Sequence, residues 1–122
     1  YSDWLKQQYE DSIRQNYSKA ITVTALLDSS YNQLVEKTLD KALKEVKPEF
    51  VIYNAGTDIL EGDGVGRLNV SFDDIVKRDL MMFKKAQEKN IPILMVLSGG
   101  YTKASAEIIK KSLVGIAKEI IS

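Results

Sequence analysis

Two polar side chains directly follow apolar segments whose composition is typical of buried strands. The apolar run that starts at Phe50 ends in Asn-Ala-Gly-Thr-Asp, whose last residue is Asp58. A second apolar run, residues 91–97, breaks at Ser-Gly-Gly and is followed by Tyr101. Parallel neighbouring strands end at the same edge of a sheet, and in open α/β sheets ligands bind at that edge. The sequence therefore predicts one edge that presents the Asp58 carboxylate and the Tyr101 hydroxyl.

The chemistry of these two side chains has several readings. A carboxylate at a strand end can ligate a metal, act as a general base or cap the following turn. A tyrosine in a glycine-rich turn can pack against its neighbours, or its hydroxyl can donate a hydrogen bond to a developing oxyanion. Asp63 stands between two glycines and is expected to be a turn residue instead of a ligand. The residue types alone leave the alternatives for Asp58 and Tyr101 open.

Glycines cluster in the two loops that carry these residues. They predict positive φ angles or a close approach of the backbone to its neighbours. Such loops can also cradle a phosphate, but the segment GDGVG lacks the Walker lysine and does not open a helix directly after a strand. A metal site is therefore the stronger prediction. The glycines are Gly56, Gly62, Gly64 and Gly66 in the first loop, and Gly99 and Gly100 in the second.

Strand and helix patterns alternate along the chain and must position this edge. Apolar and β-branched runs predict strands at residues 21–27, 50–55 and 92–97. Apolar residues at helical spacing predict helices over about residues 31–46, 72–89 and 103–121, with a helical lead-in at 1–18. This alternation predicts an α/β fold with three αβα layers around a parallel sheet. Residues 1–122 are expected to form a single partial domain.

Local signals predict where some helices begin and end. The cluster at residues 28–30 is expected to provide an N-cap just before its helix. Ser71, with Asp74 three residues later, resembles a capping box. Asn90 is expected at the C′ position of the helix that follows, with a proline just beyond it. The apolar side of the last helix is expected to include Leu113.

The composition narrows the function classes. The chain has 17 basic and 17 acidic residues and a net charge of zero, so no direct nucleic-acid or membrane partner is predicted. It contains no cysteine, which excludes disulfides and thiolate metal sites. It also contains no histidine, so these residues alone do not make a self-sufficient zinc hydrolase or Ser-His hydrolase. Without a visible signal peptide, and opening on Tyr1, the chain is expected to be an intracellular piece of a longer protein.

At the two loops the sequence resembles a known family. The segments NAGTDILEGDGVGRLNVS, IVKRD and PILMVLSGGY follow one another as in the C-terminal part of the histone deacetylase family, and look most like its class IV members. The resemblance runs over about residues 19–113. It implies the C-terminal portion of an arginase/deacetylase-like α/β fold with a parallel sheet. It also implies hydrolysis of the acetyl or acyl amide of lysine with the help of one zinc ion.

The resemblance also implies roles for individual residues. Asp58 matches the second aspartate ligand of the zinc. Tyr101 matches the tyrosine that hydrogen-bonds the substrate carbonyl and stabilises the tetrahedral intermediate. Gly64 stands where family members usually carry a larger, often basic residue. The matching pocket and loop residues are Gly56, which leads into Asp58, the pair Gly99 and Gly100, and the L-x-G-D-x-x-G residues Leu60, Gly62, Asp63 and Gly66.

In the family the other aspartate, the ligating histidine and the histidines of the general base lie upstream of these motifs. We therefore expect the isolated chain to be inactive and not to hold zinc tightly. The implied partner is an acetylated lysine of a histone or another protein, in the nucleus or cytoplasm. Strand edges left without their neighbours favour self-association. Two alternatives stay open: a non-catalytic regulatory or binding module with the same fold, and a small flavodoxin-like domain that binds a phosphate ligand.

Overall fold

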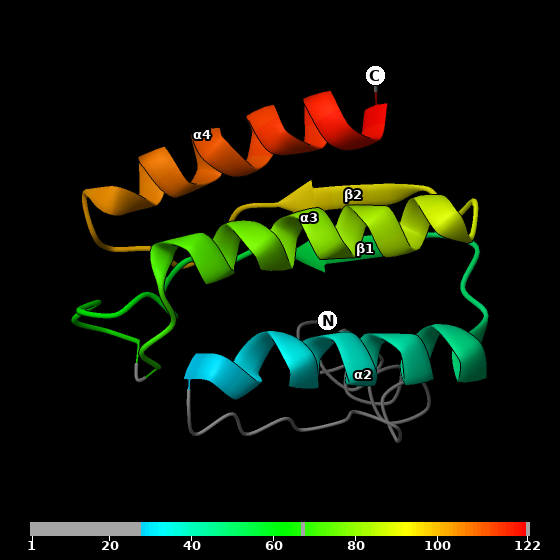
Figure 1. Cartoon of the computed structure of the whole chain (residues 1–122), viewed down its shortest axis with the longest axis horizontal. Helices are drawn as coiled ribbons and strands as arrows, with labels where there is room; N and C mark the ends of the chain where they lie inside the picture. The colour runs from blue at the N-terminus through cyan, green and yellow to red at the C-terminus, as the bar shows by residue number, and fades with distance from the viewer. Residues whose placement is uncertain (1–27, 67, 122) are drawn as a thin grey trace, which may run out of the picture.

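The computed structural model describes residues 28–66 and 68–121. Helices and strands alternate in it (Figure 1), which confirms the predicted α/β class. The strand expected at residues 21–27 and the lead-in helix at 1–18 lie outside the described residues. The elements are α2 (Asp28–Val46), β1 (Val51–Asn54), α3 (Phe72–Glu88), β2 (Ile93–Val96), α4 (Ala104–Ile116) and the π-helical turn η1 (Ala117–Ile121).

The two strands are parallel neighbours, as the sequence predicts. Their register pairs Val51 with Ile93 and Asn54 with Val96. The hydrogen-bond ladder continues past both strands, because the backbone N–H of Ala55 donates to the carbonyl of Val96 at 2.9 Å. One step further, the N–H of Thr57 donates to the carbonyl of residue 99 at 2.6 Å. The loops that carry Asp58 and Tyr101 therefore leave the sheet at the same edge.

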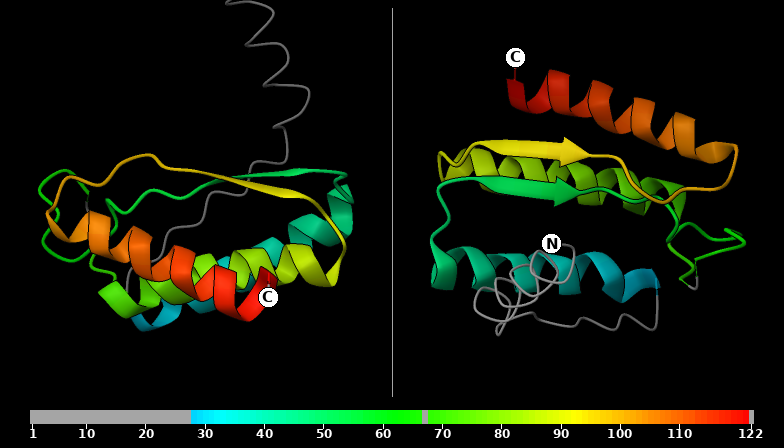
Figure 2. Two further views of the ribbon diagram at one scale, coloured as in Figure 1. Left: turned by 90° about the horizontal axis from the view of Figure 1, so that it is seen from above. Right: turned by 180° about the vertical axis from the view of Figure 1, so that it is seen from behind.

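Helices α2, α3 and α4 lie side by side in one layer on a single face of the sheet (Figure 2). Helix α3 packs between the other two. The opposite face is apolar and exposed, with Ile52 67% and Leu94 49% accessible to solvent. The described residues thus supply two of the three layers that the sequence predicts. No helix among them is long and apolar enough to cross a membrane.

The boundaries of α3 follow from its capping residues. Ser71 is the N-cap, and its Oγ accepts a hydrogen bond from the N–H of Asp74 at 3.2 Å while donating to the Asp74 carboxylate at 2.8 Å. Beyond the other end, Asn90 has a φ of 55°, the left-handed conformation expected at C′. Both predictions are confirmed. The N-cap predicted at residues 28–30 is wrong, because α2 begins at Asp28 and these residues form its first turn.

The apolar core lies beneath the carboxyl ends of the strands. Leu60 and Val70 form an isolated parallel bridge that closes the long glycine-bearing loop at its base, and both side chains are buried. Helices α3 and α4 contribute Ile75 and Ile108, which are fully buried. Leu113 was expected on the buried side of the last helix, but it is 51% exposed. Since α4 packs mainly against α3, only a narrow stripe of α4 is covered.

Candidate functional site at the carboxyl edge of the sheet

The Asp58 carboxylate lies between the ends of the two strands. A Cβ atom added at Gly56 would stand 2.8 Å from Oδ1 of Asp58, and one added at Gly99 would overlap Oδ2. Gly99 is therefore required by close approach, as the clustering predicts, whereas a side chain at Gly56 would meet only the ends of the Asp58 and Ser98 side chains. Asp58 is partly buried, and its carboxylate lies close to Gly56 of the first loop and Gly99 of the second. This arrangement holds a single carboxylate at the predicted ligand-binding edge.

Tyr101 leaves the second strand end at the same place. A Cβ atom at Gly100 would overlap the hydroxyl of Thr57, so the second loop runs tightly along the first. The Tyr101 side chain is 65% exposed, which leaves its hydroxyl accessible. Its backbone N–H donates a 3.0 Å hydrogen bond to Oδ2 of Asp63. The structure thus brings the loops of Asp58 and Tyr101 together and ties them to each other.

Asp63 organises its own loop as well. Its Oδ1 accepts hydrogen bonds from the backbone N–H groups of Val65 at 2.9 Å and Gly66 at 3.0 Å. The bonds from Gly66, Val65 and Tyr101 stabilise the charged form and lower the pKa of the Asp63 carboxyl. The prediction that Asp63 is a turn residue is confirmed. All of its described hydrogen bonds come from backbone groups, so its carboxylate shapes the loop.

The remaining loop residues take different roles. Gly62 has a φ of 82°, and a Cβ at Gly66 would overlap the backbone carbonyl of Asp58, so both need to be glycine. Gly64 has neither a positive φ nor any atom within 4 Å of an added Cβ, so the prediction made for all loop glycines is wrong there. Leu60 belongs to the core beneath the loop.

Behind this edge lies a buried polar network that sequence analysis missed. Asp79 is fully buried and accepts hydrogen bonds from the Tyr53 hydroxyl at 2.5 Å and the Ser112 hydroxyl at 2.7 Å. The Arg78 guanidinium donates two more, from Nε at 3.0 Å and Nη2 at 2.8 Å. A signal was present in the sequence. Arg78 and Asp79 stand three and four residues after Ile75, which places this charged pair on the buried face of α3.

Tyr53 and Arg78 both keep their usual protonation states near neutral pH. Burial raises the pKa of the Tyr53 hydroxyl, so this phenol stays protonated and acts as a donor. Burial also opposes the charge on Arg78, but neighbouring Tyr53 and Asp79 outweigh that effect and raise the pKa of the guanidinium. Arg78 therefore remains a cation paired with the Asp79 carboxylate.

Two contacts connect the helices to the loops at the edge. Nη1 of Arg78 donates a 2.9 Å hydrogen bond to the carbonyl oxygen of Gly56, two residues before Asp58. The Thr57 hydroxyl donates to the Ser105 hydroxyl of α4 at 2.9 Å. Helices α3 and α4 thus both hold the turn that delivers Asp58.

Asp58 has the chemistry to supply one ligand of a metal site. In residues 28–66 and 68–121, no three His, Cys, Asp or Glu side chains gather into a group that would hold a metal ion. A catalytic zinc takes three protein ligands and an open position, and a carboxylate is one of its usual ligands. The described residues therefore fit zinc as the source of one ligand.

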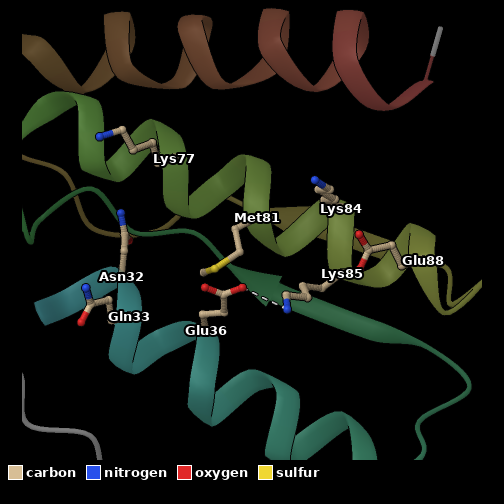
Figure 3. Close-up of a pocket in the computed structure, with 8 residues that line it drawn as sticks. All are labelled: Asn32, Gln33, Glu36, Lys77, Met81, Lys84, Lys85 and Glu88. Atoms are coloured by element: carbon tan, nitrogen blue, oxygen red, sulfur yellow. Dashed lines mark ion pairs between the residues drawn. The ribbon is translucent and has the colours of Figure 1, made fainter.

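A separate hollow of about 390 Å³ lies between α2 and α3 (Figure 3). Lys85 crosses it and forms ion pairs with Glu36 at 3.0 Å and Asp40 at 2.9 Å. Neither Asp58 nor Tyr101 lines it, so it is distinct from the edge of the sheet. Its lining residues are Asn32, Gln33, Glu36, Lys77, Met81, Lys84, Lys85 and Glu88.

Comparisons with known proteins agree with this fold. Residues 2–116 match the model of the histone deacetylase domain. Histone deacetylase 2 of Arabidopsis thaliana is 42% identical over 101 residues, which cover 83% of this chain and 26% of that protein. Histone deacetylase clr6 of Schizosaccharomyces pombe is 33% identical over 75 residues, which cover 62% of this chain and 18% of that protein.

The site and fold are those of an α/β protein with a polar carboxyl edge, and the chain belongs to the histone deacetylase family. This confirms the resemblance seen in the two loop motifs. The chain spans about a quarter or less of the length of these relatives.

Proposed function

We propose that this chain is the C-terminal part of a zinc-dependent lysine deacetylase and supplies one metal ligand and one oxyanion donor to its active site. The observation that carries the proposal is the packing of the Asp58 carboxylate against Gly99, two residues before Tyr101. Family membership supports the reaction class. The proposed substrate is an acetylated lysine of a histone or another protein, and the proposed compartment is the nucleus or the cytoplasm.

Each residue has a defined task in this proposal. Asp58 binds the metal through its carboxylate. When bound, zinc lowers the pKa of a coordinated water and polarises the substrate carbonyl. The exposed hydroxyl of Tyr101 donates a hydrogen bond to the substrate carbonyl oxygen as negative charge develops on it. Gly99 and Gly100 carry no side chains, which lets the second loop pass close to Asp58 and Thr57 on its way to Tyr101.

The other functional groups of the site come from outside residues 1–122. This chain has no histidine to serve as the usual general base or as a metal ligand. One carboxylate falls two ligands short of a catalytic zinc site. The isolated chain is therefore expected to be inactive and to lose zinc on dialysis.

A chimera tests the proposal directly. In it, this chain replaces the aligned segment of the Arabidopsis relative, and zinc content and turnover of an acetyl-lysine peptide are measured. Tyr101→Phe is expected to retain zinc and lower kcat by about 10²–10³-fold, the usual cost of one oxyanion donor. Asp58→Asn is expected to lose zinc as well as activity. Glu61→Gln, which alters an exposed carboxylate in the same loop, is the matched control and keeps both.

A second experiment measures the mass, zinc content and turnover of the isolated chain. A species of 13.7 kDa by intact mass, without stoichiometric zinc or turnover, is the expected result. Stoichiometric zinc with turnover at that mass would refute the assignment of ligands. Retention of zinc by the Asp58→Asn chimera would remove Asp58 from the metal site.

A further inference from the structure

The guanidinium of Arg78 serves two partners at once. Nε and Nη2 hold the buried carboxylate of Asp79, while Nη1 reaches out of the helix layer to the carbonyl oxygen of Gly56. The Arg78 side chain is 5% exposed, so this third contact is made in a desolvated setting where a charged hydrogen bond is strong. Arg78 is therefore both part of the core and part of the edge.

The carbonyl of Gly56 needs a partner from outside the sheet. Successive backbone groups of a strand point to opposite edges, and Ala55 and Thr57 point toward the second strand, where they donate to Val96 and Gly99. Gly56 points the other way, and no described strand lies on that side of β1. Arg78 supplies the hydrogen bond that a neighbouring strand would otherwise give.

Gly56 is also the surface on which the Asp58 carboxylate rests. The space beside its Cα is filled by Oδ1 of Asp58, since an added Cβ would lie only 2.8 Å away. A shift of the Gly56 peptide therefore moves the carboxylate with it. A continuous chain of contacts runs from Asp79 through Arg78 and Gly56 to Asp58.

We propose that Arg78, anchored by Asp79, is a positioning residue that fixes the Gly56 peptide and thereby the direction of the Asp58 carboxylate. This rests on the proposed function in so far as Asp58 is a metal ligand. A buried ion pair contributes little to stability compared with apolar residues of the same volume. The use of Arg78 is explained by its fork of donors, which reaches a carboxylate and a backbone carbonyl together.

The test compares Arg78→Lys with Ser112→Ala. A lysine keeps the charge beside Asp79, but its single ammonium group does not reproduce the fork that holds both partners. Ser112→Ala removes a different hydrogen bond to the same Asp79 carboxylate and leaves the contact between Arg78 and Gly56 in place. Ser112→Ala is thus the matched control for damage to the buried network. Asp79→Asn is a second variant, which weakens the anchor without changing its shape.

Two readouts are taken. The first is amide hydrogen exchange in the full chain at Thr57 and Leu60, whose N–H groups donate to residues 99 and 57, with Ile91 as the internal reference. Arg78→Lys is expected to speed exchange at Thr57 and Leu60 about tenfold relative to Ile91, as a local opening. The second is zinc affinity of the chimera by chelator competition, expected to fall about 10–100-fold, as for other residues that orient a ligand. Ser112→Ala is expected to lower thermal stability. It should nevertheless leave both the exchange at Thr57 and Leu60 relative to Ile91 and the zinc affinity unchanged.

The outcomes separate this inference from the proposed function. Equal acceleration at Thr57, Leu60 and Ile91 in Arg78→Lys, or the same pattern in Ser112→Ala, would show a purely structural role and overturn the inference. If Arg78→Lys does not fold, Asp79→Asn is measured in its place. Faster exchange at Thr57 and Leu60 relative to Ile91 would then support the inference, and equal acceleration at all three positions would overturn it. If the unmodified chimera binds no zinc, the proposed function fails, and the exchange pattern alone decides whether Arg78 holds the turn.

Discussion

The backbone N–H of Tyr101 donates a 3.0 Å hydrogen bond to the carboxylate of Asp63, which lies 38 residues earlier in the chain. The other oxygen of the same carboxylate holds two backbone N–H groups of its own loop. One side chain therefore fixes the shape of the first loop and the position of the second. This couples the backbone of the proposed oxyanion donor to the loop that follows the proposed metal ligand.

Asp63→Asn tests this coupling. The amide oxygen of asparagine can still accept from Val65 and Gly66, whereas its NH₂ group does not accept from Tyr101. We expect amide exchange at Tyr101 to rise roughly tenfold, as for loss of a hydrogen bond to a charged group, with a smaller change at Gly66. In the chimera, kcat should fall while zinc content is unchanged. A Tyr101 amide as protected as before would show that the bond does not hold the second loop.

The pH dependence of stability follows from the same carboxylate. Backbone hydrogen bonds lower the pKa of Asp63 below its ordinary value of 3.8 in the folded chain. Its stabilising contribution is therefore complete above pH 3.8 and is lost as pH falls through the lower folded value. The unfolding free energies of the unmodified chain and of Asp63→Asn are measured from pH 6 downward. They should differ in the upper part of this range, above pH 3.8. This difference should shrink in acid, and a constant difference would contradict the assignment.

Gly99→Ala tests the close packing around Asp58. The added methyl group would overlap Oδ2 of Asp58, so the carboxylate or the second loop has to move. We expect a destabilisation of about 1–3 kcal/mol, as for other overpacked sites, and loss of zinc from the chimera. Gly64→Ala is the matched control, because nothing lies within 4 Å of its added methyl and its φ is not positive. Equal effects of the two substitutions would refute the packing argument.

The elements of the fold could be predicted because their signals are local. Ser71 and Asn90 mark the ends of α3 through capping geometry that depends only on neighbouring residues. Leu113 was misplaced because the width of the buried stripe depends on how many neighbours a helix has, which its own periodicity does not encode. Asp28 was misplaced because a residue that favours an N-cap is also tolerated in a first turn.

In the candidate site, too, the residues with local signals could be predicted, and those that depend on long-range contacts could not. Asp58 and Tyr101 could be placed at one edge of the sheet because each lies in the loop that follows an apolar strand. The support behind them depends on contacts between distant segments, such as the carboxylate of Asp79 with Ser112 33 residues later. Charged residues on a helix are usually solvated, so only their position on the apolar face of α3 indicated burial.

Tyr53→Phe tests the energetic weight of the buried network. It removes the hydroxyl that donates to Asp79 at 2.5 Å and leaves the ring in place over Arg78. We expect a loss of about 1–3 kcal/mol in unfolding free energy, the cost of a buried group that loses a partner. Urea unfolding followed by circular dichroism measures it. Tyr101→Phe, at an exposed hydroxyl, is the control and should leave stability unchanged; a neutral Tyr53→Phe would contradict the argument.

The exposed face of the sheet predicts the oligomeric state of the isolated chain. Ile52 and Leu94 are paired in register and lie side by side on this face, and the two-stranded sheet has open edges among the described residues. We expect the isolated chain to associate with a second copy through this face, since exposed apolar surface and unpaired edges favour that contact. Sedimentation should show a concentration-dependent dimer. Ile52→Lys should shift it to monomer, whereas Val65→Lys, an equally exposed position in the loop, should not. A monomer at all concentrations, or equal effects of both substitutions, would show that this face does not mediate association.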